Sequence, residues 1–333
     1  MNWALIGAST IASQHMIGAL TAHPEGNVLW VVSGSSSRGA EYATQYSIPN
    51  ASVELADALS DPTVDAVYIS STNEKHFDQA MAAIMAGKHV LCEKPLAMNV
   101  SDAITMVNAA ENADVVFATN HHLRCSGSHN AVRNIVAAGR IGKVLSARIF
   151  HAVHLPENLQ GWRIDSKASG GGVVLDITVH DADVVRFLLD EDPVSVVAQT
   201  TSLGMGKGVE DSVMSVWQMP SGALITSHES FTHPFAGSGF EIHGTEGSIF
   251  ANGVMTQLPV GKIELVTAAG REVVPFDDYN LYAYGVARFC DAVAGKGRPA
   301  ADGWDGVKSL AIARAVQDAA ESGTRVAVAY EAS

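Results

Sequence analysis

The first third of the chain contains five short, uninterrupted apolar runs, each followed by a stretch in which apolar residues recur with helical spacing. An uninterrupted apolar run is typical of a strand buried on both faces, as in a parallel sheet that helices cover on each side. The alternation therefore predicts a series of β-α-β units, which make an α/β fold. The runs are Trp3–Ile6, Val28–Val32, Ala66–Ile69, Val90–Cys92 and Val115–Ala118.

The pattern changes near residue 147, where polar and apolar residues begin to alternate. A period of two indicates strands with one covered face, so we expect a second, α+β domain with a largely antiparallel open sheet. A length of 333 residues also favours two domains, predicted as 1–122 and 123–333, with a cleft between them. The alternating runs are 147–153, 194–198, 213–217 and 223–227, and an alanine-rich helix is expected over 307–320.

Composition argues against several classes of partner and site. The net charge of −14 opposes binding to a polyphosphate backbone, and no local basic patch offsets it. Cys92, Cys125 and Cys290 are odd in number and far apart, so neither a disulfide framework nor a zinc site is expected. The sequence shows no signal peptide and no apolar run of about 20 residues. We therefore expect a cytoplasmic protein that binds neither nucleic acid nor membrane, while its oligomeric state stays open.

A glycine-containing turn, Gly7-Ala8-Ser9-Thr10-Ile11-Ala12, directly follows the first predicted strand and opens a helix. In this context the turn predicts dinucleotide binding, because the helix N-terminus offers unpaired N–H groups and a partial positive charge to a pyrophosphate. Ser9 and Ala12 replace the second and third glycines of the usual GxGxxG pattern. Ala12 is a tolerated variant, whereas Ser9 places a Cβ where the backbone should approach phosphate. Its hydroxyl could donate a hydrogen bond in return.

The choice of dinucleotide is predicted from the end of the second strand. An acidic residue there would accept the ribose 2′-hydroxyl of NAD, but the chain has Ser33-Gly34-Ser35-Ser36-Ser37-Arg38 instead. Hydroxyl donors and a guanidinium suit a 2′-phosphate, so NADP is favoured over NAD. The alternative is that Arg38 is a solvated residue in the first turn of the next helix.

Three residues are predicted to be catalytic: Lys94, Asp176 and His180. Lys94 follows a parallel strand, at the edge of the sheet where ligands of such folds bind, and Pro95 permits a cis peptide bond before it. A glycine-rich turn at 170–172 leads into a helix on which Asp176 and His180 are four residues apart and therefore on one face. Reduction of a carbonyl needs a group that stabilises the developing alkoxide and a proton source. Lys94 and His180 can share these roles, with Asp176 orienting the imidazole or holding the substrate.

Alternatives to these roles were a surface lysine, a solvated Asp/His pair and a metal site. No metal is expected, because zinc and iron sites need a third ligand and hydride transfer needs no metal. His121, His122, His151 and His154 are not expected to be metal ligands. Of these, His151 and His154 could lie near sugar hydroxyls.

Four segments together resemble the glucose-fructose oxidoreductase, inositol dehydrogenase and rhizopine-catabolism (Gfo/Idh/MocA) family of dehydrogenases. They are GASTIA, the segment 70–76, AGKHVLCEKPLAM and GGGVVLDITVHDAD. The resemblance implies a Rossmann domain in front of a substrate domain and hydride transfer from NADPH to the 2-keto group of a sugar.

The resemblance also implies further contacts to the cofactor. Residues expected around its adenosine phosphate half are Ser9, Thr10, Ile11, Ser33 and Arg38. Residues expected around the nicotinamide are Ser71, Thr72, Asn73, His76, Glu93, Lys94 and Asn120, with Trp162, Arg163 and Tyr282 reaching in from the second domain. For these last three, a core tryptophan, a surface ion partner and a packing tyrosine are the plain alternatives.

Two other functions stay open. One is an NAD(P)-dependent dehydrogenase that oxidises a polyol, inositol or another sugar with the same residues. The other is a non-catalytic NADP sensor, which the presence of all three predicted catalytic residues disfavours. A purely structural protein would leave the glycine-containing turn and the EKP segment unexplained.

Overall fold

The computed structural model describes residues 1–331 and divides the chain into two compact units. Unit 1 comprises Met1–His122 and Tyr282–Val307, and unit 2 comprises Leu123–Leu281 with the described part of Lys308–Ser333. The chain is thus not split at a single boundary. Residues 282–307 lie in unit 1, although the sequence placed them in 123–333.

This difference has a physical reason. The Trp3 ring packs on Phe289 with ring centroids 5.2 Å apart, and Asp302 forms an isolated antiparallel bridge with Ala118. Trp3 is fully buried, so the late segment completes the core around the first strand.

Unit 1 is built on a six-stranded parallel sheet in the order β3-β2-β1-β4-β5-β6. All four residues of β4 are buried, as expected of a strand covered on both faces. Successive strands are added towards one edge of the sheet up to β3 and towards the other edge from β4 onward, so the strand order switches between β1 and β4. Ligands of such sheets bind outside the carboxyl ends of the strands at this switch point. The strands are β1 (Asn2–Ile6), β2 (Asn27–Val32), β3 (Asn50–Ser52), β4 (Ala66–Ile69), β5 (His89–Cys92) and β6 (Phe117–Thr119). The parallel Rossmann-type sheet is confirmed.

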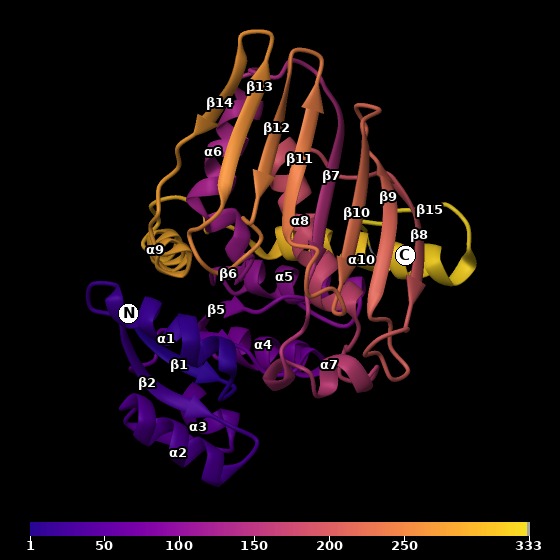
Figure 1. Ribbon diagram of the computed structural model, residues 1–333. Coiled ribbons are helices and arrows are strands. Elements are labelled where there is room, and N and C mark those ends of the chain that lie inside the picture. The colour runs from indigo at the N-terminus through magenta and orange to yellow at the C-terminus, as the bar shows by residue number, and fades with distance from the viewer. Residues whose placement is uncertain (332–333) are drawn as a thin grey trace. The chain divides into compact units, whose positions relative to one another are not determined.

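The helices of unit 1 connect these strands (Figure 1). A π-helical turn, η1 (Ala12–Met16), runs directly into α1 (Ile17–Ala22) after the glycine-containing turn. The other connecting helices are α2 (Ser36–Tyr46), α3 (Leu55–Leu59), η2 (Asn73–Lys75), α4 (His76–Met85) and α5 (Val100–Asn112). Helix α9 (Leu281–Val293), most of which belongs to unit 1, comes much later in the chain and connects none of these strands.

Unit 2 is built on a nine-stranded sheet in which β7 and β10 pair in parallel and every other pair is antiparallel. The order is β14-β13-β12-β11-β7-β10-β9-β8-β15. The strands are β7 (Val144–Ala152), β8 (Ser195–Thr201), β9 (Ser212–Gln218), β10 (Leu224–Ser230), β11 (Ser238–Gly244), β12 (Gly247–Asn252), β13 (Lys262–Thr267), β14 (Gly270–Val274) and β15 (Val326–Ala327).

One face of this sheet is covered and the other is open, as predicted. On β9, Val213 and Trp217 are buried while Met214 and Val216 are exposed. Helices α6 (Gly127–Ala137) and α8 (Val179–Leu189) lie on one side of the sheet (Figure 1). The remaining helical segments are η3 (His122–Cys125), η4 (Glu157–Leu159), α7 (Trp162–Asp165), η5 (Val174–Thr178) and α10 (Gly303–Ser322), which begins in unit 1. No helix among residues 1–331 is long and apolar enough to cross a membrane.

Candidate functional site

The turn after β1 is built around Gly7, whose φ of +114° favours glycine. A Cβ on Gly7 would lie 2.9 Å from the backbone nitrogen of Ser71, which follows β4. The loops after β1 and β4 therefore approach more closely than a side chain allows. The turn then enters the helical segment that begins at Ala12, so backbone N–H groups at a helix N-terminus lie beside the switch point of the sheet. This arrangement fits a dinucleotide.

The Ser9 hydroxyl forms hydrogen bonds to two other groups of the protein. It donates to the Ser70 hydroxyl at 2.7 Å and accepts from the Ala12 backbone N–H at 3.2 Å. The departure from glycine thus stabilises the start of the helix and joins the turn to the end of β4. Thr10 and Ile11 complete this turn, and Tyr42 on α2 donates to the Ser9 carbonyl at 3.0 Å.

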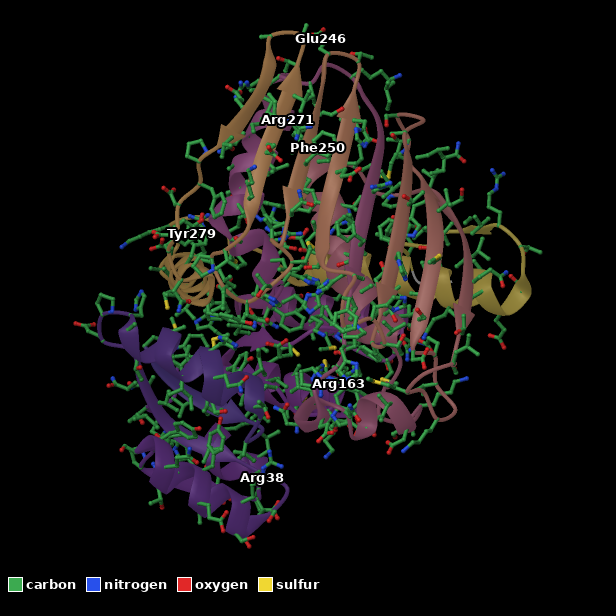
Figure 2. All side chains as sticks on the ribbon, viewed as in Figure 1. Arg38, Arg163, Glu246, Phe250, Arg271 and Tyr279 are labelled. Carbon is green, nitrogen blue, oxygen red and sulfur yellow. The ribbon has the colours of Figure 1, made fainter. Side chains whose placement is uncertain are left out.

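Arg38 lies in the first turn of α2, and its exposed side chain reaches back to the same loop (Figure 2). Its Nη2 atom donates to the Ala8 carbonyl at 2.5 Å. Ser33 at the end of β2 is buried and Gly34 is exposed. The structure therefore joins Arg38 to the turn after β1 within unit 1.

The loop after β4 carries four of the predicted cofactor contacts. Ser71 donates to Gln79 Oε1 at 2.6 Å, and Thr72 donates to Glu74 Oε1 at 2.7 Å. His76 is fully buried, and its Nδ1 and Nε2 lie 2.8 Å from the Pro95 carbonyl and 3.2 Å from the Ser71 carbonyl. Burial lowers the pKa of His76 and so favours the neutral ring. His76 thereby links this loop, which includes the buried Asn73, to the loop that carries Lys94.

Lys94 follows the end of β5 and is half-buried, with a cis peptide bond to Pro95. The preceding residue, Glu93, is buried and accepts hydrogen bonds from the Tyr68 hydroxyl and the Asn120 amide, both at 2.6 Å. Burial raises the pKa of the Glu93 carboxyl. Glu93 and Asn120 are therefore hydrogen-bonded to each other at the carboxyl ends of the strands, and Glu93 directly precedes Lys94.

In unit 2, the glycine-rich turn brings the short helix α7 against the start of η5. A Cβ on Gly171 would lie 2.4 Å from the Trp162 carbonyl oxygen, which no side chain could accommodate without movement of the backbone. Gly171 N–H donates to the Ser166 carbonyl at 2.9 Å, and Gly172 N–H donates to the Arg163 carbonyl at 2.8 Å. The absence of a side chain at Gly171 thus lets two backbone segments pack directly together.

This contact places Arg163 beside Asp176 (Figure 2 labels Arg163). The Arg163 Nε atom lies 3.3 Å from Asp176 Oδ2, and its guanidinium also stacks over the Trp162 ring at 4.6 Å. Trp162 is only partly buried, so it is not a core residue. Of the predicted site residues, Trp162, Arg163 and Asp176 are therefore brought together within unit 2.

Asp176 and His180 lie on one continuous helical segment, η5 followed by α8. The sequence predicted a regular helix, but Val174–Thr178 forms a π-helical turn, which is wider and occurs often at functional sites. His180 is mostly buried in the first turn of α8.

Glu210 supports the start of this segment, and the sequence analysis did not identify it. Its Oε1 accepts from the Val174 backbone N–H at 3.3 Å and from the Gln317 amide at 3.4 Å. Gly172 has a φ of +111°, and a Cβ there would lie 2.4 Å from the same carboxylate oxygen. Burial raises the pKa of Glu210. Its carboxyl group fills the space beside the glycine.

Tyr282 does not lie in the second unit, which corrects the prediction that it reaches in from there. It belongs to unit 1 and is buried between two imidazoles, stacked on His15 at 4.8 Å and on His122 at 5.3 Å. Packing against these rings is the alternative that the sequence had left open.

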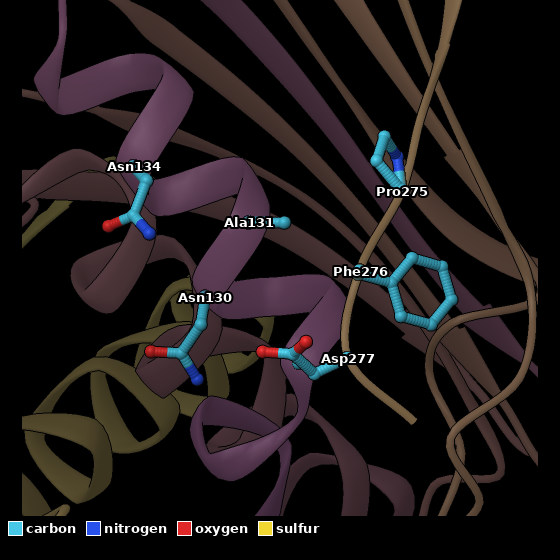
Figure 3. Close-up of a pocket in the computed structure, with 7 residues that line it drawn as sticks. Asn130, Ala131, Asn134, Pro275, Phe276 and Asp277 are labelled. Atoms are coloured by element: carbon cyan, nitrogen blue, oxygen red, sulfur yellow. The ribbon is translucent and has the colours of Figure 1, made fainter. Parts of the chain in front are cut away.

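A hollow of about 350 Å³ lies elsewhere in unit 2, between α6 and residues 275–277. Figure 3 shows Asn130 and Asn134 on α6 and Asp277 on the segment that faces it. None of the predicted site residues lines it.

Comparison with known proteins gives two family matches. Residues 1–121 match the oxidoreductase family with an NAD-binding Rossmann fold, and residues 129–250 match the GFO/IDH/MocA C-terminal domain. The chain is 53% identical to 1,5-anhydro-D-fructose reductase from Ensifer adhaerens over 97% of both chains. It is 30% identical to myo-inositol 2-dehydrogenase from Thermotoga maritima over 80% of both. Among solved structures, aldose-aldose oxidoreductase from Caulobacter crescentus has the same fold, with a TM-score of 0.90 and 24% identity over 98% of this chain and 99% of that one.

The close packing at the glycine-rich turn generates a stability prediction. Gly171→Ala is expected to lower the free energy of unfolding by about 1–3 kcal/mol, because the new methyl group must push α7 away. The control is Ala168→Ser, an exposed position in the same turn, for which a change within about 0.5 kcal/mol is expected. Urea denaturation measures both, and equal stabilities of the two variants would contradict the packing argument.

Proposed function

The chain belongs to the Gfo/Idh/MocA family of sugar oxidoreductases, and from this membership we propose that it reduces the 2-keto group of 1,5-anhydro-D-fructose to 1,5-anhydro-D-mannitol with NADPH. The observation that carries the substrate assignment is the 53% identity to the reductase from Ensifer adhaerens over 97% of the chain. The presence of Lys94, Asp176 and His180 supports catalysis rather than mere sensing of the cofactor.

In this proposal the residues of the chain handle binding and the proton. The reduced nicotinamide, when bound, supplies the hydride. Hydride addition to the carbonyl carbon turns the C=O group into an alkoxide, and the alkoxide oxygen takes up one proton to give the alcohol. Lys94 and His180 share the stabilisation of the alkoxide and the donation of this proton. Asp176, paired with Arg163, is fixed in orientation and holds a substrate hydroxyl or the His180 imidazole.

The preference for NADPH is argued from the end of β2. No acidic residue stands there to accept a ribose 2′-hydroxyl, and Ser33 and Arg38 offer donors instead. The contact of Arg38 with Ala8 supports a guanidinium close to the turn that would hold the phosphates. A cytoplasmic location is also part of the proposal. The burial of Cys92, Cys125 and Cys290 without a disulfide in the described part of the chain supports a reducing compartment.

A second candidate is oxidation of a polyol or inositol, which the 30% identity to myo-inositol 2-dehydrogenase favours. One assay separates the candidates. NADPH oxidation is measured against 1,5-anhydro-D-fructose, other 2-keto sugars and osones, and NADP⁺ and NAD⁺ reduction against inositol and polyols. Turnover of polyols alone would replace the reductase proposal, and binding of NADPH without any turnover would indicate a sensor.

Lys94→Ala is expected to lower kcat by about two to four orders of magnitude, because the alkoxide loses its cationic or proton-donating partner. Affinity for NADPH, measured by fluorescence titration, should stay within a few-fold. Lys296→Ala, at an exposed position of the same unit, is the control and should leave kcat unchanged. A fully active Lys94→Ala enzyme would remove the lysine from the mechanism.

Arg38→Ala is expected to weaken NADPH about tenfold to a hundredfold, the effect of one lost hydrogen bond to a charged group. NADH has no 2′-phosphate, so its affinity should change much less. Calorimetric titration of both cofactors measures the difference, with Glu41→Ala on the exposed side of α2 as the control. Equal losses for both cofactors would place the 2′-phosphate elsewhere.

A further inference from the structure

Two buried acids and one histidine meet between α8 and the covered face of the sheet in unit 2. Asp181 lies on α8, Glu229 on β10 and His151 on the neighbouring β7, where Glu229 and His151 are directly paired in the register of the two strands. Asp181 and Glu229 are 0% exposed, whereas the His151 side chain keeps 14% exposure. His151 is therefore the member of this acid–histidine cluster that can contact a small molecule.

In each acid of the cluster, one carboxyl oxygen forms a hydrogen bond and the other has no donor in the described part of the chain. His151 Nδ1 lies 3.0 Å from Asp181 Oδ1, and the Ser227 hydroxyl donates to Glu229 Oε1. Asp181 Oδ2 and Glu229 Oε2 are buried, and among the described residues no N–H or O–H group donates to either. The two carboxyl groups contact each other, so two ionised acids would repel with both oxygens unsatisfied. One proton between them satisfies both oxygens.

A second proton lies between Asp181 and His151. Asp181 forms an ion pair with His151, and a fully buried negative charge needs such a partner. Two protons shared among these three groups make the cluster neutral. Burial raises the pKa of both carboxyls, in agreement with this count. If the second proton is on Nδ1, the ring is an imidazolium with protons on both nitrogens. If it is on the Asp181 carboxyl, Nδ1 accepts a hydrogen bond and the neutral ring carries its proton on Nε2. In both cases Nε2 of His151 is protonated.

Two neighbouring groups, Ser227 and His129, do not alter this count. Ser227 is neutral, and His129 on α6 is fully buried. Burial, together with the nearby His151, lowers the pKa of His129 to about 3, so it stays uncharged at neutral pH. Neither group therefore exchanges a proton with the cluster at neutral pH.

We propose that Asp181 and Glu229 are positioning residues that share one buried proton and thereby hold His151 as a hydrogen-bond donor at Nε2 for an oxygen of the keto sugar. Asp181 directly follows His180 on α8, and β7 leads through residues 153–161 into α7, which carries Arg163. The link to sugar reduction rests on the proposed function, whereas the protonation of the cluster does not.

The protonation is tested by nitrogen NMR of the intact protein labelled on its histidine rings, with His151→Gln assigning the signals. At pH 7 the Nε2 atom of His151 is expected to be protonated, and it should remain so in Glu229→Gln, since the amide donates to Asp181 Oδ2 as the acid does. In Asp181→Asn the ring is expected to become neutral with an unprotonated Nε2. An unprotonated Nε2 in the wild-type protein would overturn the proposal, whatever the enzyme reduces.

The effect on catalysis is tested by a double-mutant cycle. Asp181→Asn and His151→Gln are each expected to lower kcat/KM for the keto sugar about tenfold to a hundredfold, with NADPH affinity intact. In the His151→Gln background, Asp181→Asn should add less than about twofold, because it acts through His151. Glu241→Gln, on the neighbouring strand β11, is the control and should match the wild type. Independent losses in the cycle would overturn the positioning role, even if the reductase activity itself is found.

The alkaline limb of the pH profile, where activity falls as pH rises, gives a further readout. Wild-type kcat/KM is expected to fall as pH rises through the value at which Nε2 loses its proton, and Asp181→Asn should move that fall to lower pH, since the neighbouring anion no longer favours the proton. Thermal unfolding of each variant shows that it is folded. An unmoved profile in a folded Asp181→Asn enzyme would contradict the proposal.

Discussion

Close approach of two backbone segments, possible only where no Cβ intervenes, is the constraint on which the functional parts of both units depend. In unit 1, Gly7 lets the turn after β1 contact the loop after β4, so that a helix N-terminus opens at the switch point of the parallel sheet. In unit 2, Gly171 lets the carbonyls of α7 lie against the glycine-rich turn, and this contact brings Arg163 to Asp176. A methyl group at either glycine would separate segments that chemistry needs to be adjacent.

Buried acids are the second theme that the two units share. Burial raises the pKa of the carboxyls of Glu93, Glu210, Asp181 and Glu229. Asp183 is a buried acid that is stabilised by a cation instead, because the buried Arg124 donates two hydrogen bonds to it. Charge that must leave water is thus either neutralised by a proton or matched by a cation. Burial raises the pKa of the acids directly beside Lys94 and His180, which are Glu93 and Asp181.

The division of the chain also separates two kinds of specificity. The residues proposed to select the cofactor, in the turn after β1 and at Ser33 and Arg38, belong to unit 1. Asp176, His180 and His151, which are proposed to act on the sugar, belong to unit 2. A solved structure of 24% identity keeps the same fold, so the fold by itself leaves the substrate open. Identity of 53% across nearly the whole chain is what narrows the proposal to one keto sugar.

Local order was determined by the sequence alone. Uninterrupted and alternating apolar patterns identified the parallel and the antiparallel sheets. The glycine turns, the EKP segment and the Asp/His spacing identified Lys94, Asp176 and His180 as candidates. These predictions were possible because each signal lies within a few neighbouring residues. The three-residue polar strand β3 was missed, since it has no apolar run. Residues 282–307 were placed in the wrong unit, and Glu210 and the pairing of Asp181 with Glu229 went unseen. Only the tertiary structure determines the placement of residues 282–307, because helix periodicity does not indicate which core a helix covers. It alone also determines which buried side chains meet, because the register of strands that are distant in sequence sets these contacts.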